Sequence, residues 1–332
     1  MKSIVGRRRF LKAVGGAATV AVLGKGTRSS QAAEKSGFKK ALITGPPDRE
    51  LLEKIKAAGF DGVEANVWGK DKKIPTPAEA AETRKIAEDL GLRVHTCLRG
   101  WARFNSLNPA EVQEDLDFTV ETLRIAQGYG ADAILLVPGR IPDDGMEMPG
   151  KREYSLKFDP NTGHVTQLVE QDNQKYQKLL YSHNHAWDAF QETIPKLIPV
   201  AQETGVVVAI ENVWNNLTLT PEHFAALIDS FDSPWIRAYF DVANHIAYGP
   251  PAEKWIEVLG DRIAKVHIKD YKWEPADGKE WPDLREGDVN FPAVIAALKK
   301  VGYGDGWLTI EGSGGLPYEE QSRRLDLIIA GS

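Results

Sequence analysis

Eight short runs of β-branched and apolar residues, separated by longer amphipathic stretches, constrain the fold of this chain more than any other feature. The runs cover residues 40–44, 62–67, 92–97, 133–137, 206–213, 236–242, 263–269 and 307–311. Strands that alternate with helical segments in this way are typical of parallel sheets. An open sheet would leave two unpaired edges, so we expect an α/β fold in which the eight strands close into a (β/α)₈ TIM barrel.

The amphipathic stretches between these runs are predicted to be helices. They cover residues 49–58, 76–90, 109–128, 186–204, 221–230 and 291–301. Several end in a glycine that introduces the next strand, as expected of a helix C-terminus: Gly59, Gly91, Gly205 and Gly302. The length of 332 residues, slightly above the usual span of one barrel, is consistent with a single domain.

One segment, at about residues 139–183, breaks the alternation of strands and helices. It contains two strand-like runs, residues 154–158 and 164–168, joined by a turn-forming segment at residues 159–163. We therefore predict a β-hairpin inserted after the fourth barrel strand. Loops after barrel strands lie on the C-terminal face, where barrel active sites form, so the hairpin could be a lid. A purely structural or oligomer-forming loop is the alternative.

Residues 1–32 have the three parts of a twin-arginine-type signal peptide. A basic region contains Arg7, Arg8 and Arg9, an apolar run covers residues 13–24, and small residues follow at 30–32. The apolar run is shorter than the roughly 20 residues that cross a bilayer, so we expect no stable membrane insertion after signal removal. Residues 33–332 then form one barrel domain, which we predict to be periplasmic or otherwise exported by the twin-arginine route.

The charge of the chain argues against nucleic acid as a partner. Residues 1–32 contain seven basic residues and no acidic one, so 34 basic and 47 acidic residues remain, a formal charge of −13. An acidic body repels a phosphate backbone. Cys97 is the only cysteine, which excludes disulfides within the chain and cysteine-based zinc clusters.

Four of the predicted strands carry a side chain able to bind metal near their C-terminal ends. These residues are Glu211, Asp241, His267 and Glu311, each flanked by apolar neighbours. Side chains in the inward register of a barrel converge on its axis, and three buried carboxylates without a cation are costly. We therefore predict one divalent metal ion. The mostly hard ligand set favours Mn²⁺, with Mg²⁺, Co²⁺ or Zn²⁺ as alternatives.

The sequence resembles the xylose isomerase-like TIM-barrel family of sugar phosphate isomerases and epimerases. The resemblance covers essentially residues 39–330, and its motifs lie at residues 210–212, 239–244, 266–270, 287–291 and 302–311. It implies that Glu211, Asp241, His267 and Glu311 bind the metal. It also implies that Glu211 and Glu311 exchange the substrate proton.

We therefore expect a metal-dependent sugar isomerase or epimerase that transfers a proton on a ketose or keto-sugar through an enediolate. The expected partner is a small sugar or sugar derivative, and export of the enzyme favours an unphosphorylated one. A homo-oligomer is compatible with these features. The alternatives are a metal-dependent lyase or hydratase that acts on keto-glycosides, and a sugar-binding barrel without turnover.

Four further residues are predicted to bind substrate hydroxyls or to orient a metal ligand. His95 is placed at the end of the third predicted strand, and Asn244 and His245 follow Asp241. Lys269 lies two residues beyond His267 on the same face of its strand. For His95 the alternative is a histidine packed in the barrel core.

Overall fold

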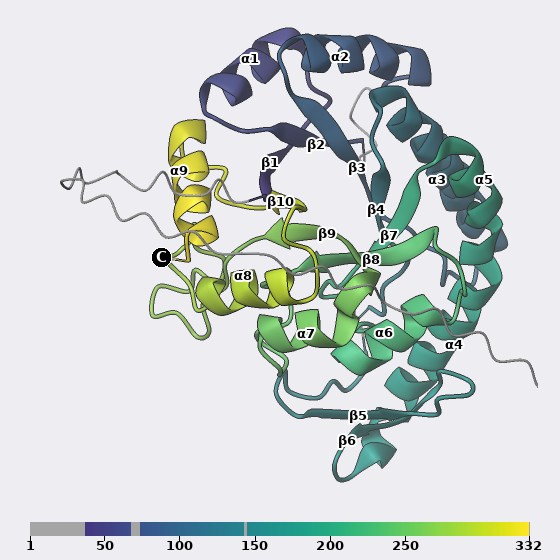
Figure 1. Ribbon diagram of the computed structural model, residues 1–332. Helices are drawn as coiled ribbons and strands as arrows, with labels where there is room; N and C mark the ends of the chain where they lie inside the picture. The colour runs from purple at the N-terminus through teal and green to yellow at the C-terminus, as the bar shows by residue number, and fades with distance from the viewer. Residues whose placement is uncertain (1–36, 68–73, 143–144, 332) are drawn as a thin grey trace, which may run out of the picture. The chain divides into compact units, whose positions relative to one another are not determined.

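Eight parallel strands close into a barrel in the computed structural model, which describes residues 37–67, 74–142 and 145–331 (Figure 1). The predicted signal peptide lies outside these residues. The barrel consists of β1 (Lys39–Thr44), β2 (Gly62–Asn66), β3 (Arg93–Trp101), β4 (Ala133–Val137), β7 (Val207–Glu211), β8 (Ile236–Asp241), β9 (Ile263–Ile268) and β10 (Trp307–Ile310). Pairing of β1 with β10 closes the ring, with Leu42 opposite Ile310. The predicted TIM barrel is confirmed.

The third strand extends further than the sequence suggested. β3 was expected to end at residue 97, but it continues to Trp101. Its pairing with β4 shifts register between Leu98 and Gly100, and Gly100 adopts a φ of 72°, which glycine tolerates without strain. The extension moves the C-terminal end of this strand away from His95.

Helices surround the strands in the described part of the chain (Figure 1). They are α1 (Arg49–Ala57), α2 (Pro77–Asp89), α3 (Pro109–Tyr129), α4 (Gln177–Thr193), α5 (Ile198–Thr204), α6 (Pro221–Asp229), α7 (Ala252–Leu259), α8 (Phe291–Lys300) and α9 (Tyr318–Ile329). Short 3₁₀ helices lie at η1 (Asn173–Tyr176), η2 (Ile194–Leu197) and η3 (Gly260–Arg262). No helix among the described residues is both long and apolar enough to cross a membrane.

Local sequence explains where several of these helices begin. Thr76 caps α2 by accepting a hydrogen bond from the backbone N–H of Glu79, whose side chain in turn accepts one from the backbone of Thr76. The helix predicted over residues 186–204 is wrong in its bounds. It begins at Gln177 and is divided near Pro195, because proline removes a backbone donor and clashes with the preceding turn.

The apolar core lies between the strands and the surrounding helices. Leu52 and Ile55, one helical turn apart on α1, are fully buried. On the opposite side of the barrel the ring of Trp255 on α7 stacks on that of Phe240 on β8, with centroids 6.3 Å apart. This packing holds the strands in place and thereby sets the positions of their C-terminal ends, which form one rim of the barrel.

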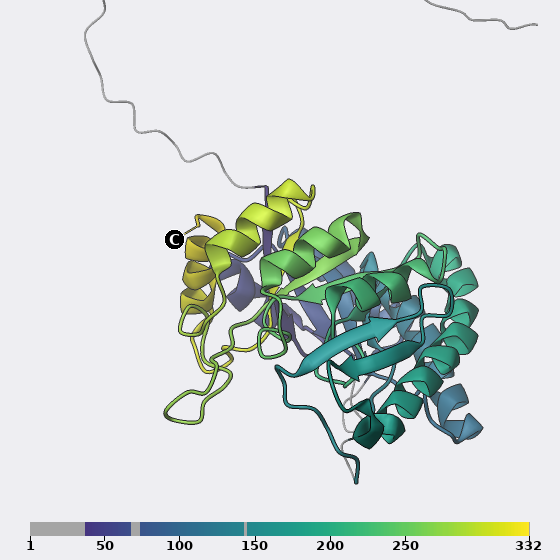
Figure 2. The ribbon, with the colours of Figure 1, turned by 90° about the horizontal axis from the view of Figure 1, so that it is seen from below.

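The insertion contains the predicted hairpin, formed by β5 (Tyr154–Phe158) and β6 (Val165–Val169), which pair antiparallel as a separate sheet. The hairpin lies beside α4 in both views (Figure 1, Figure 2). The side chain of Asn184 on α4 accepts a hydrogen bond from the backbone N–H of Val165 and donates one to the backbone carbonyl of the same residue. The last residues of the predicted insertion, from Gln177 on, already belong to α4. The Tyr154 ring lies 6.0 Å from that of Tyr248, which follows β8, so the hairpin reaches the C-terminal face.

Candidate metal centre

The four residues predicted to bind metal lie together where β7, β8, β9 and β10 end. Each of Glu211, Asp241, His267 and Glu311 offers one ligand atom, and these atoms all lie within 4.8 Å of one another. Glu211 and Asp241 are the last residues of their strands, and Glu311 directly follows β10. Neighbouring parallel strands end at the same rim, which explains why residues 100 positions apart in the sequence converge.

The electrostatics of the cluster fit a divalent cation. Asp241 Oδ2 is buried and has no hydrogen-bond partner among the described residues. Burial raises the pKa of Glu211 and of Asp241, and repulsion from Glu311 adds to both shifts. Burial opposes ionisation of Glu311 as well, but the His267 ring, whose Nδ1 lies 3.2 Å from Glu311 Oε2, and the positive charge of Lys269 hold the pKa of Glu311 below its ordinary value. A cation facing these oxygens removes the conflict between the carboxylates.

The backbone around Asp241 is held by a neighbouring side chain that the sequence reasoning did not single out. Asn212 Oδ1 accepts a hydrogen bond of 2.7 Å from the backbone N–H of Asp241. Its Nδ2 donates to the backbone carbonyl of the same residue at 2.9 Å. The sequence signals were the position of Asn212 directly after Glu211 and its place in the motif at residues 210–212. Its amide therefore ties the end of β7 to the end of β8.

Asn244 contacts Asp241 and Asn212, and His245 contacts Asn212. The backbone N–H of Asn244 donates to Asp241 Oδ1 at 2.7 Å, and its side chain donates to the Asn212 carbonyl at 3.0 Å. His245 Nδ1 lies 3.2 Å from Asn212 Nδ2, and burial lowers the pKa of His245 to about 3. These contacts fit the expected role of orienting a ligand better than that of contacting substrate.

Lys269 is the predicted residue that points into the centre. Its Nζ lies 3.4 Å from Glu311 Oε2 and 3.4 Å from Asn244 Oδ1. The same ammonium lies 4.3 Å from the centroid of the Trp281 ring. Lys269 is thus a positive charge beside the carboxylate cluster, within reach of an oxygen of a bound ligand.

His95 does not lie at the end of its strand, so this part of the prediction is wrong. It is the third residue of β3, near the N-terminal end of the barrel. Its ring stacks on Trp307 with centroids 4.3 Å apart, and its Nε2 lies 2.9 Å from Thr309 Oγ1. Burial lowers the pKa of His95 well below its ordinary value, so the ring is neutral. His95 is a histidine of the barrel core, the alternative considered above.

The comparison with protein families agrees with this architecture. A family model described as xylose isomerase-like TIM barrel matches residues 52–327. The chain belongs to this family. Among sequence relatives, L-ribulose-5-phosphate 3-epimerase UlaE of Escherichia coli O1:K1 is 23% identical over 273 residues, covering 80% of this chain and 82% of the relative. The uncharacterized protein MJ1311 of Methanocaldococcus jannaschii is 24% identical over 270 residues, covering 78% and 77%.

Solved structures of sugar epimerases share the fold. A D-tagatose 3-epimerase-like protein has a TM-score of 0.65 at 18% identity, covering 88% of this chain and 98% of that structure. D-psicose 3-epimerase of Clostridium cellulolyticum H10 has a TM-score of 0.64 at 13% identity, with 88% and 98% covered. The 3-keto-D-glucoside 4-epimerase YcjR of E. coli has a TM-score of 0.60 at 16% identity, with 88% and 99% covered.

In this member of the xylose isomerase-like family, the insertion contacts an aromatic cluster beside the candidate metal centre. Trp214, Tyr271 and Trp281 lie with neighbouring ring centroids 5.0 to 5.7 Å apart. Trp214 Nε1 donates to the backbone carbonyl of Asn244. Lys151 of the insertion lies 3.9 Å from the Trp214 ring centroid. The cluster therefore joins the insertion to the loops that surround the predicted metal ligands.

Beneath the predicted ligands the barrel interior contains a buried polar contact that the sequence did not predict. Glu64 of β2 and Tyr239 of β8 are both fully buried, and the Tyr239 hydroxyl donates to Glu64 Oε2. Glu64 Oε1 lies 3.2 Å from His267 Nε2. Burial, together with the Glu64 carboxylate, raises the pKa of Tyr239 well above its ordinary value, so the hydroxyl stays protonated.

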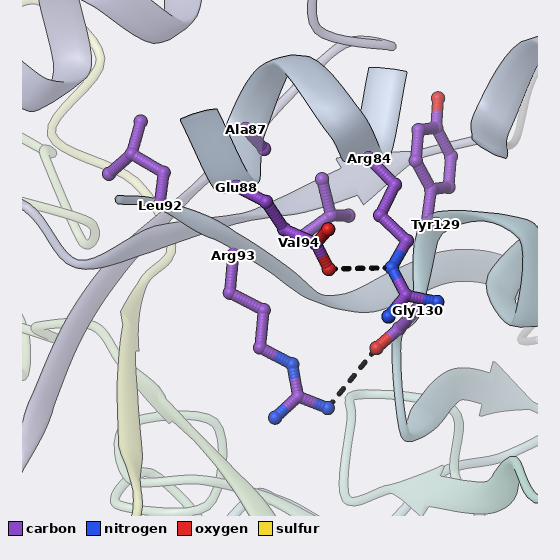
Figure 3. A pocket seen from close by; sticks show the side chains of 8 residues that line it. All are labelled: Arg84, Ala87, Glu88, Leu92, Arg93, Val94, Tyr129 and Gly130. Atoms are coloured by element: carbon purple, nitrogen blue, oxygen red, sulfur yellow. Dashed lines mark hydrogen bonds and ion pairs between the residues drawn. The ribbon is translucent and has the colours of Figure 1, made fainter. Parts of the chain in front are cut away.

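A separate cavity of about 530 Å³ lies between α2, α3 and the start of β3 (Figure 3). Because it adjoins the start of a barrel strand, it lies at the end of the barrel opposite the candidate metal centre. Its charged side chains are already paired. Arg84 donates to Glu88 at 2.7 Å, and Arg93 donates to the Gly130 carbonyl at 3.1 Å. None of the residues of the predicted metal cluster lines this cavity. We therefore place the candidate site at the C-terminal rim.

Proposed function

We propose that this protein is a divalent-metal-dependent sugar epimerase or isomerase that moves a proton on a ketose or keto-sugar. The observation that carries the proposal is the position of two glutamates around one histidine nitrogen. Glu211 Oε1 lies 3.1 Å and Glu311 Oε2 lies 3.2 Å from His267 Nδ1. The sugar epimerases among the relatives and structural neighbours support the same reaction class.

The two glutamates come from strands that are not neighbours. In the closed ring, β8 and β9 separate β7 from β10, so Glu211 and Glu311 approach the centre from two directions. One carboxylate can remove the proton next to a carbonyl while the other returns a proton. Return to the opposite face of the same carbon gives an epimer, whereas return to the neighbouring carbon gives an aldose from a ketose.

The metal would be held by the four residues of the cluster. A bound divalent cation supplies positive charge that favours loss of a proton next to a carbonyl. Three carboxylates and one imidazole form a mostly hard set of donors, so we propose Mn²⁺ before Mg²⁺, Co²⁺ or Zn²⁺. Lys269, 3.4 Å from Glu311 Oε2, would stabilise negative charge on a substrate oxygen.

We propose a sugar without a phosphate group as the substrate, and a protein that works outside the cytoplasm. The acidic body and the twin-arginine pattern at Arg7, Arg8 and Arg9 support this choice. A keto-glycoside is included, because one structural neighbour is a 3-keto-D-glucoside 4-epimerase. On such a substrate the same pair of glutamates could instead promote elimination, the reaction of a lyase.

Proton exchange with solvent tests the proposal. Purified protein loaded with Mn²⁺ is incubated in D₂O with a panel of ketoses and keto-glycosides, and products are followed by NMR and mass spectrometry. Deuterium next to a carbonyl supports the isomerase or epimerase, and an unsaturated product indicates the lyase. Bound metal without exchange or product in any member of the panel contradicts catalysis and favours a sugar-binding protein.

A pair of variants assigns the chemistry to the cluster. Glu311→Gln keeps the size of the side chain but removes its basicity, so we expect exchange to fall by at least about 100-fold. Glu203→Gln is the matched control, because Glu203 is exposed near the end of α5 that precedes β7. Exchange by Glu311→Gln equal to that of the control would exclude Glu311 from proton transfer.

A further inference from the structure

The buried contact between Glu64, Tyr239 and His267 crosses the inside of the barrel. Glu64 lies on β2 and His267 on β9, and 203 positions separate them in the sequence. Glu64 Oε1 lies 3.2 Å from His267 Nε2, while Glu64 Oε2 accepts the hydrogen bond of the Tyr239 hydroxyl. All three side chains have at most 1% of their surface exposed. The contact is therefore shielded from solvent.

A fully buried carboxylate needs specific partners. Without partners, such a group strongly destabilises an apolar interior, so a core position is normally filled by an apolar residue. Glu64 has two donors within reach, one for each oxygen, in the Tyr239 hydroxyl and the His267 ring. The arrangement is complete only when His267 Nε2 carries a hydrogen.

This requirement determines which nitrogen of His267 has a lone pair available for a metal. A neutral imidazole carries one hydrogen, so a hydrogen on Nε2 leaves the lone pair on Nδ1. Nδ1 is the nitrogen that lies 3.1 Å from Glu211 Oε1 and 3.2 Å from Glu311 Oε2. A cation bound between Nδ1 and the two glutamates would face the Nδ1 lone pair, whereas the opposite tautomer would direct the Nε2 lone pair at a Glu64 oxygen, which is repulsive.

We propose that Glu64 and Tyr239 are positioning residues that hold His267 in the Nε2–H tautomer and present Nδ1 to a divalent metal. Tyr239 acts on His267 through Glu64. The hydrogen bond from the Tyr239 hydroxyl to Glu64 Oε2 fixes the orientation of the carboxylate, and Glu64 Oε1 is thereby held next to His267 Nε2. Partners of this kind orient metal-binding histidines and increase their basicity. The inference rests on the metal centre of the proposed function but concerns residues outside the predicted ligand set.

Two conservative variants test the role of these residues in metal binding. Glu64→Gln keeps the volume and one acceptor but loses the charge, and Tyr239→Phe removes the hydroxyl alone. We expect Glu64→Gln to raise the dissociation constant for Mn²⁺ by about 10- to 100-fold, and Tyr239→Phe to raise it by a smaller factor. Tyr129→Phe is the matched control, because Tyr129 is a buried tyrosine at the end of α3. Binding is measured by electron paramagnetic resonance of free Mn²⁺.

A second measurement reports the tautomer directly. In Zn²⁺-loaded protein with ¹⁵N-labelled histidine, we expect the His267 signals to show a protonated Nε2 and a metal-bound Nδ1. This readout needs no variant and would not follow from a purely structural role. Metal bound through Nε2, or unchanged Mn²⁺ affinity in both folded variants, overturns the positioning role. If the wild-type protein binds no Mn²⁺, the metal centre itself is refuted and the positioning role with it.

Discussion

Acid should destabilise this protein through a histidine outside the candidate metal centre, His183 on α4. Its side chain is 2% exposed, and its Nε2 has no hydrogen-bond partner among the described residues. The ring lies 5.7 Å from that of His223 on α6. Burial lowers the pKa of His183 to about 3, and the neighbouring His223 contributes in the same direction. The folded protein therefore keeps this ring neutral.

The sign and size of the effect follow from the two pKa values. In the unfolded chain a histidine takes up a proton near pH 6.5, whereas folded His183 does so only near pH 3. The stability that depends on neutral His183 is therefore complete above pH 6.5 and is lost as pH falls toward 3. Between pH 7 and pH 5 the expected loss is about 2 kcal/mol, at about 1.4 kcal/mol for each pH unit below 6.5.

Urea unfolding of the metal-free protein at pH 7 and pH 5 measures this loss. His183→Phe cannot take up the proton, so its free energy of unfolding should fall by about 2 kcal/mol less than that of the wild type over the same interval. Protonation of the carboxylate cluster affects both proteins and cancels in the comparison. His164→Gln is the control, because His164 pairs with Asp188 at the surface. Equal losses in wild type and His183→Phe would refute the argument.

Three further outcomes can be measured. Mn²⁺ at 100 times its dissociation constant should raise the free energy of unfolding by about 2.7 kcal/mol. Calorimetry with and without a chelator measures this difference, and an unchanged melting temperature would argue against a metal site. Gly163→Ala should destabilise the hairpin and lower the melting temperature, because a Cβ there would lie 1.8 Å from the Trp187 ring and the φ is +76°. Replacing Arg7, Arg8 and Arg9 with lysine should retain the precursor in the cytoplasm, and unchanged export in cell fractionation would contradict a twin-arginine signal.

Local patterns in the sequence were sufficient for most of the fold. The eight strands were predicted from short apolar runs between helical stretches, and seven of the eight end within two residues of their predicted ends. The exception is β3, whose bulge at Gly100 carries it to Trp101. Register shifts depend on how a strand pairs with its neighbour, so they are difficult to predict from the sequence of one strand.

The four predicted ligands could be selected because they share a position as well as a residue type. Each lies near the end of one of four consecutive strands of the barrel, and the rim of parallel strands brings such positions together. Lys269 could be placed on the same grounds, since it follows His267 by two residues. His95 could not, because its distance from the rim depended on the length of β3.

What only the tertiary structure decided is the environment of those ligands. The sequence alone determined the alternation of strands and helices, the hairpin and the convergence of Glu211, Asp241, His267 and Glu311, because each follows from a local period and a barrel rim. The contacts of Glu64 and Tyr239 with His267 join strands on different sides of the barrel interior. Such contacts depend on which side chains face one another once the eight strands have closed into a barrel. The periodicity of a single segment cannot predict this.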